Sequence, residues 1–263
     1  MARACLRSGR SRTAQAAPML KLHTFPPFRG TVSASPFTTK VDALLCMAGL
    51  PFERVHADVR KAPRGKLPVL VDGDRVIPDS TLIEAHLVAA HGADFTAGMD
   101  ARDRALDTAI RRMCEHHLYF LIGHFRWTLH PDTVREGYFA EIPRPLRGVV
   151  FGIVSRTMRK TARLQGLGRF TEEEKAMLAR QDIDALADLL GERPFYFGEA
   201  PRSVDACVFG AIHTVLRCDL DTPARDAILA RPTLVDFEER LRSRLYDDAM
   251  APRGVSAAAR SAG

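Results

Sequence analysis

The spacing of apolar residues changes once along this chain of 263 residues, near residue 100, and the change restricts the folds that the chain can adopt. Before residue 100, short alternating runs predict strands, and apolar residues at helical spacing predict two helices between them. After residue 100, only the helical spacing remains. The sequence therefore predicts an α/β unit of order β-α-β-β-α over residues 19–92, followed by an all-α unit over residues 100–250.

The elements of the first unit end at residues that favour turns. The Asp72-Gly73-Asp74 segment predicts a hairpin between the last two strands, and Asp79-Ser80 predicts the start of the second helix. Only a short element is expected between residues 58 and 65. Strands are predicted at 20–25, 52–57, 67–71 and 75–77, and helices at 41–48 and 80–91.

Two helix starts in the second unit have contrasting caps. Thr171 and Glu174 predict a capping box. Before Asp205, however, the position that such a box reserves for Ser or Thr holds Arg202. The capping box is therefore broken unless the helix start shifts by one residue to Ser203, and we expect a less stable helix start there.

The net charge of +6 comes from the two ends of the chain. Residues 1–18 contain four arginines and no acid, residues 251–263 contain two arginines and no acid, and the rest is neutral. Net charge therefore gives no reason to expect a nucleic acid partner. We expect a disordered N-terminal extension over residues 1–18 and a disordered tail over residues 251–263. The first segment also has the composition of a transit peptide, and Met19 is an alternative start of translation.

Cysteine usage and hydropathy restrict the cellular location. The five cysteines are scattered, without a C-x-x-C pair or a spacing typical of zinc sites, which favours a reducing compartment such as the cytoplasm. No apolar stretch reaches the roughly 18 residues that a membrane-spanning helix requires. We expect no transmembrane segment.

Both units contain short motifs that point to one family. The motifs are S-P-F-T-T-K at 35–40, G-L-P-F-E at 49–53, G-K-L-P-V-L at 65–70, I-P-D-S-T at 77–81, Q-G-L-G-R at 165–169, P-F-Y-F-G at 194–198 and S-V-D-A-C-V-F-G at 203–210. Together they resemble one branch of the glutathione transferase superfamily, the branch that includes metaxins, failed axon connections proteins and bacterial transferase-like proteins. The resemblance implies a thioredoxin-like N-terminal domain and an all-helical C-terminal domain. It also implies that the chain binds glutathione and transfers it to a small hydrophobic electrophile, as a cytoplasmic homodimer with a role in detoxification.

The resemblance assigns Lys66, Leu67, Pro68, Asp79 and Ser80 to glutathione binding. A cis bond before Pro68 would turn the backbone of Leu67 toward the cysteinyl part of the ligand. The helix start at Asp79-Ser80 would bind the γ-glutamyl end. The alternatives are an ordinary trans proline, as in about 95% of X-Pro bonds, and a plain N-cap worth about 1 kcal/mol.

Ser35 occupies the position at which related transferases carry the cysteine of a C-P-F motif. As the catalytic residue it would donate a hydrogen bond to the glutathione thiolate, assisted by the N-terminus of the following helix. Alternatively, Ser35 only caps that helix, with Pro36 at its first position. Ser33, Thr38 and Thr39 are near enough to compete for the same role.

His117, Tyr119 and Trp127 are assigned by the resemblance to the cleft for the second substrate. His117 and His124 lie two helical turns apart on an apolar stripe, without an H-E-x-x-H spacing or a third ligand. We therefore interpret these two histidines as residues of the core or of the pocket wall, and we expect no metal.

A basic segment over residues 144–169 favours an alternative function. It holds seven Arg and Lys residues and no acid, interleaved with apolar residues. Such a segment is typical of a solvated helix face, but it also fits a membrane-surface or partner helix. The alternative function is a non-catalytic, metaxin-like interaction or membrane-surface module that retains the fold.

Overall fold

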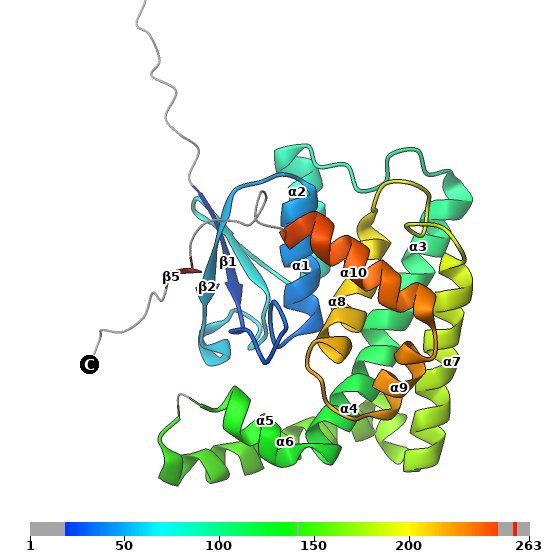
Figure 1. Cartoon of the computed structure of the whole chain (residues 1–263). Helices are drawn as coiled ribbons and strands as arrows, with labels where there is room; N and C mark the ends of the chain where they lie inside the picture. The colour runs from blue at the N-terminus through cyan, green and yellow to red at the C-terminus, as the bar shows by residue number, and fades with distance from the viewer. Residues whose placement is uncertain (1–18, 141, 247–254, 257–263) are drawn as a thin grey trace, which may run out of the picture.

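A mixed β-sheet forms the first part of the molecule, with its strands where the apolar residues alternate (Figure 1). The computed structural model describes residues 19–140, 142–246 and 255–256, so the expected extension over 1–18 lies outside the described residues. The strand order in the sheet is β4-β3-β1-β2-β5. The strands are β1 (Leu20–Thr24), β2 (Phe52–His56), β3 (Val69–Asp72), β4 (Arg75–Pro78) and β5 (Val255–Ser256).

The register of the sheet places the end of β1 next to the start of β3. β1 runs parallel to β2 and antiparallel to β3, with His23 opposite Val69. β3 and β4 form the expected hairpin, with Gly73 in the turn at a φ of +56°. Short strand β5 lies within the segment expected to be a disordered tail; the other residues of 247–263 lie outside the described ones.

Two helices, α1 (Pro36–Met47) and α2 (Ser80–His91), lie between the sheet and the helices of the second part (Figure 1). The short element between residues 58 and 65 is the 3-10 helix η1 (Val59–Lys61). The thioredoxin-like order of the first part is confirmed. The second part consists of α3 (Ala101–Met113), the π-helix η2 (Cys114–Leu118), α4 (Tyr119–Leu129), α5 (Pro131–Tyr138), α6 (Arg144–Gln165), η3 (Leu167–Arg169), α7 (Glu172–Leu190), α8 (Ser203–Leu216), α9 (Pro223–Leu229) and α10 (Pro232–Tyr246).

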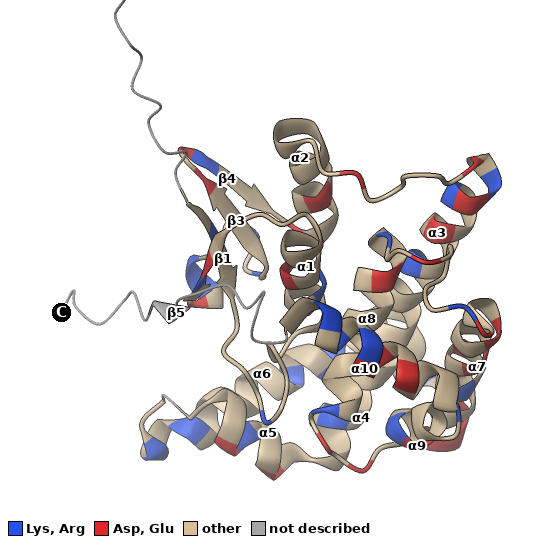
Figure 2. Ribbon diagram, turned by 45° about the horizontal axis from the view of Figure 1, so that its top comes forward, with Lys and Arg blue, Asp and Glu red and all other residues tan. Residues whose placement is uncertain are grey.

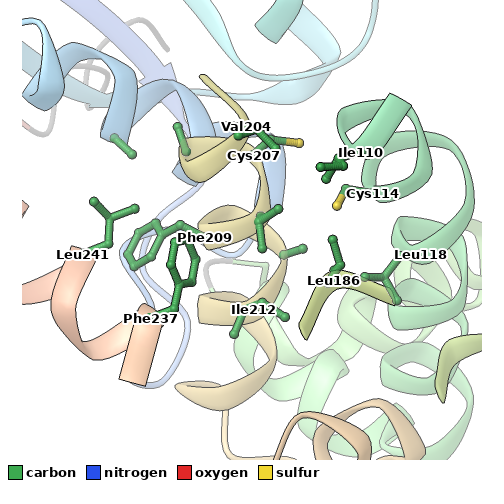
Figure 3. Close-up of a cluster of buried hydrophobic side chains, with 14 of the residues drawn as sticks. Ile110, Cys114, Leu118, Leu186, Val204, Cys207, Phe209, Ile212, Phe237 and Leu241 are labelled. Atoms are coloured by element: carbon green, nitrogen blue, oxygen red, sulfur yellow. The ribbon is translucent and has the colours of Figure 1, made fainter. Parts of the chain in front are cut away.

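Helix α8 is the centre of the core. All of its residues except Leu216 are buried. Its side chains extend to α10 on one side and to α3, η2 and α7 on the other, as Figure 3 shows around Phe209 and Ile212. Gly210 packs against α1: a Cβ at this position would lie 2.4 Å from the carbonyl oxygen of Pro36. Only glycine therefore permits this close approach of α1 and α8.

The start of α8 is capped by a residue that is distant in sequence. The Asp107 carboxylate on α3 accepts hydrogen bonds from the Ser203 hydroxyl at 2.9 Å and the Val204 N–H at 3.0 Å. Asp205 accepts from the N–H of Arg202 at 2.6 Å. Asp107 thus stabilises the start of α8, whose N-cap position holds Arg202 in place of Ser or Thr. The capping box of Thr171 and Glu174 at α7 is confirmed.

A buried ion network joins the two parts of the molecule. Lys40 of α1 is 1% exposed, and its ammonium lies 2.9 Å from Glu115 of η2 and 3.2 Å from Glu84 of α2. Arg111 of α3 contacts Glu84 at 2.9 Å, and Arg112 contacts Glu115 at 2.7 Å. Because each buried charge has an opposite partner, the network compensates for part of the cost of desolvation.

Lys40→Met should lower the free energy of unfolding by about 3 kcal/mol, because removal of one partner leaves Glu84 and Glu115 buried with less compensation. Urea unfolding monitored by circular dichroism measures the change. Lys160→Met on α6, where the lysine is exposed, is the matched control and should change stability by less than about 0.5 kcal/mol. Equal stability of Lys40→Met and the wild type would contradict the role of the network.

Candidate functional site

β3 follows a cis peptide bond between Leu67 and Pro68, as the resemblance implies. The pairing of His23 with Val69 places the end of β1 beside Pro68. Leu67 is 7% exposed, and its N–H and C=O form no hydrogen bond with the described residues. A buried backbone amide needs a partner, so this position can accept an extended ligand.

Asp79 joins β4 to α2 in a conformation that residues other than glycine rarely adopt, with φ +79° and ψ 133°. Its N–H donates to the Pro68 carbonyl at 3.3 Å, and its carboxylate accepts from the Thr81 N–H at 2.9 Å. Ser80 is 3% exposed, and its hydroxyl bonds none of the described residues. The start of α2 is therefore joined to Pro68 through the backbone N–H of Asp79.

Most hydroxyls in the segment from β1 to α1 are bonded to one another. Ser33 is 2% exposed and lies 3.1 Å from the Thr24 hydroxyl and 2.5 Å from the Thr38 hydroxyl. Thr38 also donates to the Ser35 carbonyl at 3.0 Å. Thr39 is buried, and its hydroxyl has no hydrogen-bond partner among the residues that the structure describes. None of these three residues presents a hydroxyl to a ligand.

Ser35 differs from its neighbours because its hydroxyl forms no hydrogen bond within the described residues. It occupies the N-cap position of α1 with Pro36 at the first helical position, but its side chain does not cap the helix. The N–H groups of Phe37 and Thr38 in the first turn have no acceptor within the helix. The half-buried Ser35 thus lies at a positive helix end with its donor unused.

The loop that carries Ser35 is held by the helical part of the molecule. The buried Arg126 of α4 donates to the Ala34 carbonyl at 2.9 Å and to the Tyr138 hydroxyl at 2.6 Å. The Val32 N–H donates to His213 of α8 at 3.0 Å. These contacts fix the backbone on the N-terminal side of Ser35, so the loop geometry depends on both parts of the molecule.

The cysteines near the site are buried. Cys46 lies on the inner face of α1, and burial raises the pKa of its thiol to about 12. Burial also raises the pKa of Cys218, and a hydrogen bond with Cys207 together with burial raises that of Cys114. These three thiols are protonated at neutral pH and do not supply a thiolate.

Tyr119 lies at the contact between the two parts of the molecule. Its ring packs edge-to-face on Phe37 of α1, with 4.8 Å between ring centroids. Both rings line a hollow of about 10 Å³, together with Lys40, Glu115 and Cys207. This volume holds about one water molecule. Tyr119 is therefore close to the start of α1, but the hollow itself is too small for an organic substrate.

His117 and Trp127 have other contacts than Tyr119. His117 is hydrogen-bonded to Asp182 of α7 at 2.6 Å, which directs the imidazole toward α7. Trp127 stacks on Phe151 of α6, with 5.9 Å between centroids, and packs edge-to-face on Tyr138 of α5, with 5.8 Å between centroids. His124, on the same stripe as His117, pairs with Glu172 at 2.9 Å.

Residues that sequence reasoning missed hold the site in place. The pairing of Lys40 with Glu115, and the contacts of Arg126 and His213 with the loop, are between residues that are 75 or more positions apart. Lys40 was visible in the sequence as the last residue of the S-P-F-T-T-K motif. The spacing of apolar residues did not predict its burial, since a lysine is rarely fully buried.

Two family models match the chain. The model described as "Glutathione S-transferase N-terminal domain" matches residues 36–133, and the one described as "Glutathione S-transferase, C-terminal domain" matches residues 179–241. The first match runs from α1 through β2, β3 and β4 into α5, and the second includes the central helix α8.

Relatives of known name include an enzyme and proteins of other kinds. The isoprene-epoxide glutathione S-transferase of Rhodococcus sp. is 31% identical over 87% of this chain and 100% of its own length. Failed axon connections of Drosophila melanogaster is 26% identical over 82% of this chain, which spans 55% of that protein. Metaxin-2 of Mus musculus is 24% identical over 79% of this chain and 81% of its own.

Solved structures of low sequence identity share the fold. A glutathione S-transferase from Methylobacterium radiotolerans, solved in complex with glutathione sulfonate, aligns with a TM-score of 0.57 at 17% identity, over 93% of this chain and 100% of that one.

Proposed function

Because this chain belongs to the glutathione transferase family, we propose that it binds glutathione and transfers it to a small hydrophobic electrophile. The observation that carries the proposal is the start of α2, where the Asp79 N–H bonds the Pro68 carbonyl and Ser80 follows at the first helical position. A cytoplasmic location, a homodimeric state and a role in detoxification belong to the same proposal.

Glutathione would bind along the start of β3 and α2. Its cysteinyl amide would pair with the unbonded N–H and C=O of Leu67, as an added strand pairs with a sheet edge. Its γ-glutamyl carboxylate would accept from the Ser80 hydroxyl and the helix start, and its ammonium would contact Asp79. Lys66 is exposed next to Leu67 and can reach the glycyl carboxylate at the other end of the ligand.

Ser35 is the proposed catalytic residue. A glutathione sulfur anchored beside Pro68 would lie at the end of the sheet where β1 finishes and the loop to α1 begins. The Ser35 hydroxyl forms no hydrogen bond with the described residues, and it lies next to the N–H groups at the start of α1. A hydrogen bond from Ser35, together with the positive end of the helix, would favour the thiolate over the thiol. The thiolate is the nucleophile of the transfer.

The electrophile would bind on the side of the site formed by Tyr119. Burial raises the pKa of the Tyr119 phenol, so its hydroxyl stays a neutral donor at physiological pH. Tyr119 and Phe37 together offer an aromatic surface near the start of α1. His117 and Trp127 belong to the same proposed wall, although the bonds of His117 to α7 and the stacking of Trp127 on α6 place them farther along it.

A second candidate function rests on the surface of α6. Leu146, Val149 and Ile153 lie on one face of this helix, and each is more than half exposed. α6 carries arginine and lysine along its length and no acid, as Figure 2 shows. An apolar stripe flanked by cations suits the interface of an anionic membrane. The metaxin relatives give weight to this module.

Asp79→Ala should weaken glutathione binding by about 1.5 to 3 kcal/mol, the range for a hydrogen bond to a charged group. Isothermal titration calorimetry measures the affinity, and circular dichroism checks the fold. Unchanged affinity in a folded variant would move the γ-glutamyl site elsewhere. Failure of the wild type to bind glutathione would refute the transferase proposal.

Ser35→Ala should shift the pH profile of glutathione conjugation to higher pH, because loss of one donor removes about 2.7 to 4 kcal/mol of thiolate stabilisation in a dry site. Glutathione affinity should stay nearly constant. Conjugation of a chromogenic electrophile across a pH series provides the measurement. Cys46→Ser is the matched control and should leave the profile unchanged. A shift produced by Ser33→Ala or Thr38→Val, but not by Ser35→Ala, would assign the donor to a different residue.

Vesicle co-sedimentation tests the second function. If α6 binds membranes, the chain should sediment with phosphatidylserine-containing vesicles at low salt, and much less at high salt or with phosphatidylcholine alone. Replacement of Leu146, Val149 and Ile153 by serine should abolish sedimentation. Leu229→Ser, at an exposed apolar residue of α9, should not. Equal sedimentation of the triple variant and the wild type would exclude the α6 face.

A further inference from the structure

Three potential metal ligands converge at the end of the β3-β4 hairpin. The Nε2 atoms of His86 and His91, both on α2, each lie 2.8 Å from Oδ2 of Asp72, the last residue of β3. The ligand atoms all lie within 4.8 Å of one another. None of the three side chains is more than about a quarter exposed, so they are held in a partly buried cluster.

The Asp72 carboxylate has one oxygen that neither histidine contacts, since His86 and His91 both bond to Oδ2. Oδ1 of Asp72 forms no hydrogen bond within the described part of the chain, so the carboxylate has capacity for a further interaction.

Beside the cluster is an open hollow of about 460 Å³ that Asp72 and His86 line together with Arg75, Ala89 and Ala90. This space admits a hydrated cation from solvent and leaves room for water on its open side. Arg75 is the one cationic side chain among these lining residues. It would repel a bare cation, but it can pair with an anion or hydroxide bound to the metal.

We propose that Asp72, His86 and His91 bind a divalent transition-metal cation of the zinc class, with a fourth position open to water. Two imidazoles and one carboxylate are ligands that Zn²⁺ accepts, and imidazole nitrogen disfavours Mg²⁺ and Ca²⁺. Bonds of about 2.1 Å in a tetrahedral site separate ligand atoms by about 3.4 Å. Each His–Asp72 separation of 2.8 Å would therefore lengthen by about 0.6 Å when the cation binds.

The position of the cluster indicates a structural role. β3 begins at Val69, directly after Pro68, and α2 begins at Ser80, whereas Asp72 and His91 are the last residues of these two elements. Asp72 is four residues beyond Pro68, or about 13 Å along an extended strand. His91 is eleven residues beyond Ser80, or about 16 Å along the helix. A bound cation would thus join the distal ends of the two elements without contact with the glutathione site.

Calorimetric titration of ZnCl₂ into the chelator-treated chain, without a histidine tag, tests the proposal. We expect one Zn²⁺ per chain and a melting temperature that rises with zinc. His91→Ala should weaken binding by at least about tenfold, since even loss of an outer-shell partner costs 10- to 100-fold. His86→Gln should do the same and provides a second variant if His91→Ala fails to fold.

His116→Ala removes an exposed histidine outside the cluster and is the matched control, with unchanged zinc binding expected. The proposal is overturned if the wild type shows neither heat of binding nor thermal stabilisation. It is also overturned if His91→Ala and His86→Gln bind zinc as the wild type does, because the binding would then come from other residues. In both cases the three side chains form only a hydrogen-bonded contact between α2 and the hairpin.

Discussion

The packing of α1 against α8 determines the geometry of the candidate site. Gly210 brings the backbone of α8 against the carbonyl of Pro36, in the first turn of α1, and Lys40 one turn later binds Glu115. α1 therefore has one position relative to the helical part of the molecule. Ser35 is attached to its start, and its neighbour Ala34 is held by Arg126. The placement of a donor at the end of α1 is thus a property of the whole fold, since each of these contacts crosses between its two parts.

Local signals were sufficient to predict the elements to which we assign the glutathione contacts. The cis bond before Pro68, the start of α2 at Ser80 and the capping box of Thr171 are encoded by neighbouring residues and a family pattern. The start of α8 was not predictable in this way, because its cap is Asp107, almost a hundred residues earlier. For the same reason the direction of His117 was not predictable: its partner Asp182 is on α7. Helical spacing places a residue on a face but does not identify the helix that covers that face.

The replacement of cysteine by serine at residue 35 changes what this site can do. A serine cannot form a mixed disulfide with glutathione, and burial keeps the thiol of Cys46 protonated. The proposed chemistry is therefore stabilisation of the thiolate of glutathione itself, which suits conjugation better than thiol-disulfide exchange. The membrane-surface alternative depends on α6, a different part of the molecule, so the two functions can coexist. The proposed glutathione site and the exposed face of α6 have no residue in common.

The π-helix η2 restricts which changes of length the chain tolerates during evolution. A π-turn accommodates one residue more than an α-turn, and each residue of a helix turns by about 100°. Deletion of one residue between Cys114 and Leu118 would rotate α3 relative to α4 by about that angle. Asp107 and Arg126, on either side of η2, could then no longer reach α8 and the Ser35 loop together. Homologues should therefore gain and lose residues in the loops around this helix pair, and keep the length of the segment between these two residues constant.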